Sequence, residues 1–186
     1  YLMIEVSNNS VLIVIDAQKG FDDPKWGKRN NPNTENVMTG VLSEFRKHKL
    51  TVIHVRHDSM KPESLLKKGK PTFAFKDEVK PLEGEIVITK HVNSAFIGTN
   101  LEEILRKMGD SNVYYMGITT DHCVSTTARM SGNLGFKSYV IEDACATFEK
   151  RDQHGKMIPA DTIHNVNLAS IHGEFAEVIR SADLVF

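Results

Sequence analysis

The stretch Val11-Leu12-Ile13-Val14-Ile15-Asp16 is a run of apolar, mostly β-branched residues that ends in a carboxylate. A continuous apolar run of this length is typical of a strand that is buried on both faces, as in a parallel sheet. Similar short runs recur along the chain. They predict a six-stranded parallel sheet with strands at 11–16, 51–57, 86–89, 113–117, 137–142 and 183–186.

Between these runs, apolar residues recur at helical spacing. Helices are expected at about 37–45, 101–108, 124–134 and 161–180. Because strands that alternate with helices are joined by right-handed crossovers, helices should cover both faces of the sheet. No internal repeat or linker divides the chain, so residues 1–186 are expected to form a single α/β domain.

Charge and composition exclude several classes of protein. Lys and Arg total 23 and Asp and Glu total 24, which leaves a net charge of −1 and no basic stripe for a nucleic acid. The longest apolar run, 11–15, is too short to span a membrane, and no secretory signal precedes it. We therefore expect a cytoplasmic protein with no nucleic-acid or membrane partner. Two cysteines do not make a disulfide framework.

One long segment, 58–81, interrupts the alternation of strands and helices. It carries six lysines together with Phe73 and Phe75. The segment is either a solvated loop with two aromatic residues packed on the body, or a lid or subunit contact that brings aromatic residues to a site. Long loops without an element of their own are often functional.

Three reactive side chains come at or just beyond the ends of predicted strands. Asp16 ends the first strand, Lys90 follows the third, and Cys123 lies just beyond the fourth. Because the carboxyl ends of parallel strands meet at one edge, these groups should converge there. Cys123 is expected to begin a helix, where the helix dipole and Lys90 would lower the pKa of its thiol. Cys145 is expected to be a packing residue.

The chain resembles the isochorismatase-like cysteine hydrolase superfamily, which includes nicotinamidases and N-carbamoylsarcosine amidase. The resemblance covers nearly the whole chain and rests on three motifs in matching order and spacing. They are Val14-Ile15-Asp16-Ala17-Gln18-x-x-Phe21, Lys90-x-x-x-Ser94-Ala95-Phe96 and Gly117-Ile118-Thr119-Thr120-Asp121-His122-Cys123-Val124. This resemblance implies a Rossmann-like, three-layer α/β/α sandwich around a six-stranded parallel sheet.

The resemblance also implies a catalytic triad. Asp16 would take the thiol proton, Lys90 would stabilise the charged pair, and the Cys123 thiolate would attack a carbonyl carbon. The backbone N–H groups of Thr119 and Cys123 would form the oxyanion hole, next to a cis peptide at Ile118–Thr119. The expected reaction is hydrolysis of an amide, ureido or carbamoyl C–N bond through an acyl-enzyme. The alternatives are an isochorismatase-type hydrolase of another small substrate and a catalytically silent scaffold.

The remaining candidates concern the substrate. Gln18 and His122 could hydrogen-bond it, and Phe21 and Trp26 could form an apolar wall. The metal-binding motif of nicotinamidases is not present. His54 and His57, three apart on a strand, point to opposite faces, so we expect one to be packed under a helix and the other to face the cleft. We therefore expect no metal and no cofactor. The expected partner is a small-molecule substrate, and the resemblance implies a homo-oligomer, either a dimer or a tetramer.

Two other classes of protein fit the sequence poorly. A nucleotide-binding module would need a glycine-rich turn after the first strand, but the turn after Asp16 contains only Gly20. A thiol-redox protein would need Cys-x-x-Cys or a nearby resolving cysteine, whereas a whole helix and strand are expected between Cys123 and Cys145.

Overall fold

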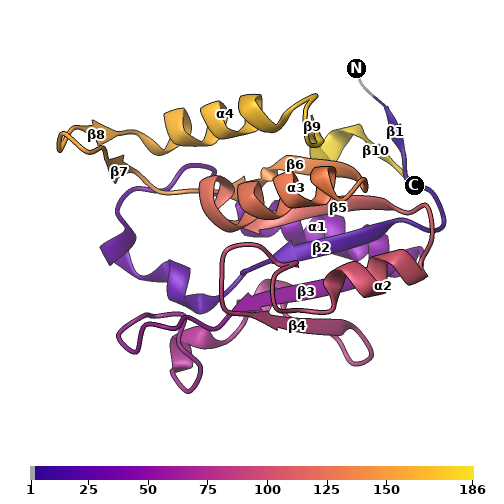
Figure 1. The fold of residues 1–186 in the computed structure, drawn as a ribbon, viewed down its shortest axis with the longest axis horizontal. Helices are drawn as coiled ribbons and strands as arrows, with labels where there is room; N and C mark the ends of the chain where they lie inside the picture. Colours follow the sequence, from indigo (N-terminus) through magenta and orange to yellow (C-terminus); the bar gives the residue numbers. More distant parts are fainter. Residues whose placement is uncertain (1–2) are drawn as a thin grey trace.

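A central parallel sheet organises the computed structural model, which describes residues 3–186 (Figure 1). Its strands lie in the order β4-β3-β2-β5-β6-β9, and every neighbouring pair is parallel. The strands are β2 (Val11–Ile15), β3 (Thr51–His57), β4 (Ile86–Lys90), β5 (Asn112–Ile118), β6 (Lys137–Ala146) and β9 (Glu177–Ile179). All residues of β2 are buried, as its apolar sequence predicts.

Helices cover both faces of this sheet and complete the predicted three-layer sandwich. α1 (Thr34–Lys47) packs Met38, Leu42 and Phe45 against one face. The other three helices, α2 (Leu101–Lys107), α3 (Ser125–Asn133) and α4 (Ala160–Ile171), cover the opposite face (Figure 1). Alternate residues of β2 enter the two apolar clusters, so the same strand supports both layers.

The sixth strand differs from the prediction. The last helix ends at Ile171, and Gly173 follows in a left-handed conformation with φ of 79°. The chain then forms β9, which pairs with β6. The helical spacing of Ile171, Phe175 and Val178 made this strand look like a continuation of the helix. The run at 183–186 instead contributes β10 (Leu184–Val185), which pairs with β1 (Ile4–Glu5) in a separate two-stranded sheet.

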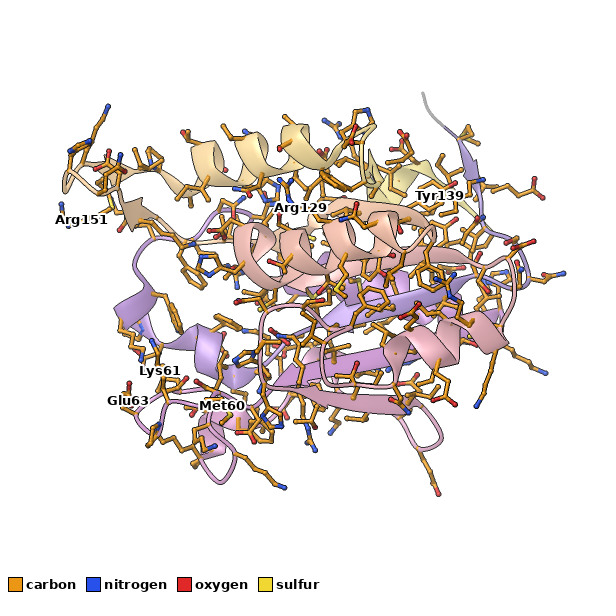
Figure 2. The ribbon with its side chains drawn as sticks, in the orientation of Figure 1. Met60, Lys61, Glu63, Arg129, Tyr139 and Arg151 are labelled. Atoms are coloured by element: carbon orange, nitrogen blue, oxygen red, sulfur yellow. The ribbon has the colours of Figure 1, made fainter. Side chains whose placement is uncertain are left out.

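The segment 58–81 consists of turns and two short 3-10 helices, Pro71–Phe73 and Asp77–Val79. Phe73 is buried, and the Arg56 guanidinium lies over the rings of Phe73 and Phe75. Figure 2 shows Met60, Lys61 and Glu63 at the outer end of this segment. Phe73 and Phe75 therefore pack on the body of the domain, which is the first of the two expectations for this segment.

A small antiparallel hairpin, β7 (Lys150–Arg151) and β8 (Met157–Ile158), follows β6 and projects beyond the sheet (Figure 1). Arg151 marks its outer part in Figure 2. Within residues 3–186, no helix has the length and apolar character needed to cross a bilayer.

Candidate active site

The three predicted residues meet at the carboxyl edge of the sheet. Asp16 directly follows β2, Lys90 ends β4, and Cys123 lies in a single wide helical turn, Thr120–Val124, between β5 and α3. The Lys90 Nζ atom is 2.9 Å from Asp16 Oδ2 and 3.2 Å from Cys123 Sγ. All three side chains are buried. The sequence prediction of their convergence is therefore matched by the geometry.

A fourth residue, His57, also contacts the Lys90 ammonium. It is the last residue of β3, the strand between β2 and β4, and its Nδ1 is 2.9 Å from Nζ. His54 points to the other face, where Nε2 is 2.8 Å from Glu85 Oε2. The two histidines thus lie on opposite faces, as their spacing predicts. The expectation that one histidine is packed and the other faces the cleft is confirmed, because His54 is buried and His57 lines the cavity described below.

The Lys90 ammonium has more hydrogen-bond acceptors around it than it has hydrogens to donate. Besides Asp16, His57 and Cys123, its Nζ lies 3.1 Å from the carbonyl oxygen of Val92. An ammonium group carries three hydrogens, so these four contacts cannot all be full hydrogen bonds at once. Burial opposes the charge of Lys90, but Asp16 and Cys123 outweigh that effect and raise the pKa of the amine. The site is therefore built around a fixed positive charge.

The structure corrects the expected pKa of Cys123. Burial, followed by the nearby Asp16 carboxylate, raises the pKa of the thiol to about 12, although Lys90 and Asn93 act in the opposite direction. The helix dipole argument considered one favourable interaction and overlooked desolvation, which is the largest effect on a buried thiol. The resting site therefore holds a protonated thiol beside an Asp16–Lys90 ion pair.

Asp16 is placed to exchange a proton with that thiol. Its Oδ2 accepts from Lys90, whereas its buried Oδ1 has no hydrogen-bond partner among residues 3–186. The reactive atoms of Asp16, His57 and Cys123 all lie within 4.8 Å of one another. Asp16 also has a left-handed backbone, with φ of 51°, a conformation that Asp and Asn tolerate better than most residues. A free carboxylate oxygen beside a thiol is the arrangement that a general base requires.

The backbone around Cys123 has the predicted form. The Ile118–Thr119 peptide is cis, and Thr119 lines the cavity described below. Gly117, opposite Ile15 in the sheet, has φ of 148°, and a β-carbon there would overlap the Ile15 carbonyl oxygen. Glycine is therefore required where β2 and β5 deliver Asp16 and Cys123 to the same edge.

A cavity of about 350 Å³ opens onto Cys123. Of the predicted substrate residues, Phe21, Trp26 and His122 line it. Phe21, Trp26 and Phe148 form an aromatic wall, with ring centroids 5.2–6.2 Å apart. The other lining residues are Lys25, His57, Leu66, Asn93, Thr119, Cys123, Glu149 and Lys150.

Gln18 does not line the cavity, contrary to the prediction. Its buried amide donates to the carbonyl oxygens of Phe73 and His57, and its Oε1 accepts from the His57 N–H. All of its polar atoms are engaged with backbone groups. Gln18 therefore fixes the end of β3 and the 58–81 segment, and the substrate has no free access to it.

Several cavity residues had no signal in the sequence. Phe148 and Glu149 follow β6 and are held by backbone pairing with the 28–30 segment, where Glu149 N–H donates to the Lys28 carbonyl at 2.8 Å. Leu66 comes from the 58–81 segment, so that segment reaches the site through an aliphatic residue. Asn93 Nδ2 lies 3.5 Å from Cys123 Sγ. These residues become neighbours only through tertiary packing.

Asp16, His57 and Cys123 form the only cluster within residues 3–186 whose donor atoms could together hold a metal ion. All three side chains already contact the Lys90 ammonium, through Asp16 Oδ2, His57 Nδ1 and Cys123 Sγ. The Lys90 ammonium already supplies a positive charge to these three side chains. A metal ion there would have to displace Lys90, whose raised pKa keeps it charged. The donor set fits an internal ammonium better than a metal ion.

The family of this chain follows from its sequence and fold together. Residues 10–183 match the isochorismatase domain. The chain belongs to the isochorismatase family. It is 48% identical over 180 residues to the uncharacterized isochorismatase family protein YrdC of Bacillus subtilis, covering 97% of this chain and 96% of YrdC. An isochorismatase-family structure from Chromobacterium violaceum is 44% identical, with a TM-score of 0.93 and coverage of 98% and 95%.

Two further members of the isochorismatase family have names that state a reaction. The ureidoacrylate amidohydrolase RutB of Klebsiella pneumoniae is 32% identical over 136 residues, which cover 72% of this chain and 52% of RutB. The N-carbamoylsarcosine amidase of Thermoplasma acidophilum is 28% identical, with a TM-score of 0.68 and coverage of 92% and 96%. The chain is accordingly an isochorismatase-family hydrolase.

Proposed function

We propose that this isochorismatase-family hydrolase cleaves a C–N bond of a small amide, ureido or carbamoyl compound through an acyl-enzyme on Cys123. The observation that carries the proposal is the buried Lys90 ammonium, which contacts both Asp16 and Cys123. A carboxylate, an ammonium and a thiol buried at one end of an aromatic cavity form a nucleophile with its own base and counter-ion.

The first step moves the thiol proton to Asp16. The free Oδ1 of Asp16 receives the proton, and the Cys123 thiolate attacks the carbonyl carbon of the substrate. Once Asp16 is protonated and neutral, its hydrogen bond from Lys90 weakens. The Lys90 ammonium can then form a stronger hydrogen bond with the thiolate sulfur of Cys123. The negative charge moves from one Lys90 acceptor to another, so the net charge of the buried site stays constant.

The second step breaks the C–N bond. The N–H groups of Thr119 and Cys123 stabilise the oxyanion of the tetrahedral intermediate. Asp16 returns its proton to the leaving nitrogen, which departs as an amine or ammonia, and a thioester remains on Cys123. Water activated by Asp16 then hydrolyses the thioester, which releases the acid and regenerates the thiol.

Two relatives support a C–N substrate. The amidohydrolase RutB and N-carbamoylsarcosine amidase are named for the cleavage of such bonds, and both share the family with this chain. The aromatic wall of Phe21, Trp26 and Phe148 suits the apolar part of a small molecule, and the cavity volume limits its size.

An ammonia-release screen over small primary amides, ureas and carbamoyl compounds tests the proposal. Isochorismate, which contains no nitrogen, is tested in parallel as the alternative substrate by chromatography of its products. Cys123→Ala is the blank, and Cys145→Ala is the matched control because Cys145 is also buried but lies outside the cavity. We expect ammonia release that Cys123→Ala abolishes and Cys145→Ala retains. Turnover that survives in Cys123→Ala would refute the cysteine mechanism, and turnover of isochorismate alone would favour the alternative.

A further inference from the structure

His57 has a role that the triad does not describe. It ends β3, lines the cavity and contacts Lys90 through Nδ1 at 2.9 Å. Its backbone is held on both sides by one residue, because the Gln18 amide bonds both the N–H and the carbonyl oxygen of His57. Gln18 therefore fixes the backbone that carries the imidazole.

The contact with Lys90 determines which nitrogen of His57 carries the hydrogen. An ammonium donates hydrogen bonds and accepts none, so Nδ1 must be the acceptor. A neutral imidazole with an acceptor at Nδ1 has its hydrogen at Nε2. Burial and the Lys90 charge lower the pKa of His57, which keeps the ring neutral.

The hydrogen at Nε2 has no acceptor in the described part of the chain. No partner for His57 Nε2 is found among residues 3–186, and this nitrogen is not one of the buried polar atoms left without a partner. His57 is half-buried, and it lines the same cavity as Cys123. An accessible donor of fixed direction beside a nucleophile is a binding group for an acceptor.

We propose that His57 is a substrate-binding residue whose Nε2–H, directed by Lys90, donates a hydrogen bond to an acceptor atom of the substrate. This inference rests on the proposed function in one respect, that Cys123 is the nucleophile of this cavity. It narrows the substrate class. The substrate carries a carbonyl oxygen, carboxylate or ring nitrogen near its scissile carbonyl, in addition to that carbonyl itself.

The apolar part of the cavity wall makes this donor selective. Phe21, Trp26, Leu66 and Phe148 contribute carbon surface to the wall, beside the polar lining residues named above. A substrate without an acceptor would displace water from Nε2–H and leave the donor unpaired, which is the situation that costs the most in a binding site. The acceptor is thus a requirement for tight binding.

Alkylation of Cys123 tests the inference without needing turnover. One probe is iodoacetyl-glycinamide, which has a second carbonyl, and the other is N-propyl-iodoacetamide, in which that amide is replaced by carbon. In both, the sulfur displaces iodide and forms a C–S bond. Mass spectrometry of the Cys123 peptide gives the two rates, and the ratio of the rates cancels any change in the reactivity of the thiol.

Three variants separate the two nitrogens of His57. His57→Asn keeps an acceptor at the Nδ1 position but places nothing at Nε2, His57→Gln places an amide near Nε2, and His57→Phe removes both. We expect the wild-type preference for the glycinamide probe to fall about 10-fold in His57→Asn and His57→Phe and to survive in part in His57→Gln. An unchanged ratio in His57→Asn would overturn the inference.

Nitrogen-15 spectra of the histidine rings give a second, independent readout. In the wild-type protein, His57 should show the neutral tautomer with hydrogen on Nε2, and Lys90→Met should release the ring to a mixture of tautomers. A hydrogen on Nδ1 in the wild type would overturn the inference. Neither result depends on hydrolysis, so an inactive protein in the ammonia screen would leave both tests interpretable.

Discussion

Replacing Asp16 with Asn should make Cys123 more reactive toward alkylating reagents while abolishing hydrolysis. The two effects separate because Asp16 does two things in the resting site. Its charge raises the pKa of the neighbouring thiol, and its free oxygen can accept the thiol proton. Asn keeps the size of the side chain and tolerates the left-handed backbone at this position, so the fold should persist.

The magnitude follows from the geometry. Unit charges 4.8 Å apart, the upper limit on the separation of the Asp16 and Cys123 atoms, interact by about 3.5 kcal/mol at an effective dielectric constant near 20. That energy corresponds to about 2.5 pKa units, so the thiol pKa should fall from about 12 to about 9.5. The thiolate fraction near neutral pH then rises about 300-fold, and the lower nucleophilicity of a less basic thiolate reduces the gain in rate to about 20-fold.

The assay is iodoacetamide labelling at a fixed pH near 8, with the Cys145 peptide as an internal reference. Lys90→Met is the opposite control, because removing the ammonium should raise the thiol pKa further and slow the labelling. In the same preparations, Asp16→Asn should lose at least about 100-fold in amide turnover, the usual effect of removing a general base. Slower labelling of Cys123 in Asp16→Asn than in the wild type would refute the electrostatic reasoning.

Three further predictions concern the frame around the site. Gly117→Ala should lower the melting temperature strongly and abolish activity, because the new methyl group would overlap the Ile15 carbonyl oxygen. The matched control is Gly84→Ala, measured in the same thermal scans, because Gly84 also has a positive φ but a methyl group there would contact no other atom. Gln18→Ala should lower kcat/KM by releasing the end of β3, and the tautomer of His57 in nitrogen-15 spectra would show whether the ring has moved. Glu35, paired with Arg29 at 2.6 Å, has a pKa of about 2 because the Arg29 bonds outweigh burial. Its contribution to stability, up to about 3 kcal/mol, is complete above its unfolded pKa and is lost as the pH falls toward 2. Glu35→Gln should therefore flatten the acid limb of a urea-unfolding series, and an unchanged limb would contradict the assignment.

The sequence predicts those features of the site that depend on strand ends. Asp16, Lys90 and Cys123 are each placed by an adjacent apolar run, and parallel topology brings such residues together whatever the loops do. His57 satisfies the same rule, and its spacing from His54 predicts that only one of the two histidines faces the cleft. The contact of His57 with Lys90 depends on the tertiary structure. Phe148 and Leu66 satisfy no rule of this kind, because their places on the cavity depend on how distant loops pair.

The misplaced sixth strand has a related cause. Ile171, Phe175 and Val178 all pack in the same apolar cluster. Ile171 does so from the helix, Phe175 from the turn that follows and Val178 from β9. Spacing along the sequence cannot distinguish these cases, since both bury the same residues. The deciding element is Gly173, whose left-handed backbone ends the helix. Its role is clear from its dihedral angle and ambiguous in the sequence, where isolated glycines also occur inside helices.

The charges of the site predict an unusually broad pH range for catalysis. Lys90 stays charged because its pKa is raised above 10.5, His57 stays neutral because its pKa is lowered below 6.5, and Cys123 stays protonated up to about pH 12. Proton transfer from Cys123 to Asp16 is internal, so it needs no proton from solvent. A site that relied on a preformed thiolate would instead gain activity as the thiol titrates.

We therefore expect kcat/KM to be nearly flat from about pH 6.5 to about pH 9. His122→Gln removes the other imidazole that lines the cavity, so it is the control for any contribution of His122 to the pH dependence of kcat/KM. A rise of kcat/KM with a midpoint between about pH 7 and pH 9, in the wild type and in His122→Gln alike, would contradict this reasoning. It would mean that the Cys123 thiolate forms before the substrate binds and that the charge around Lys90 is divided differently.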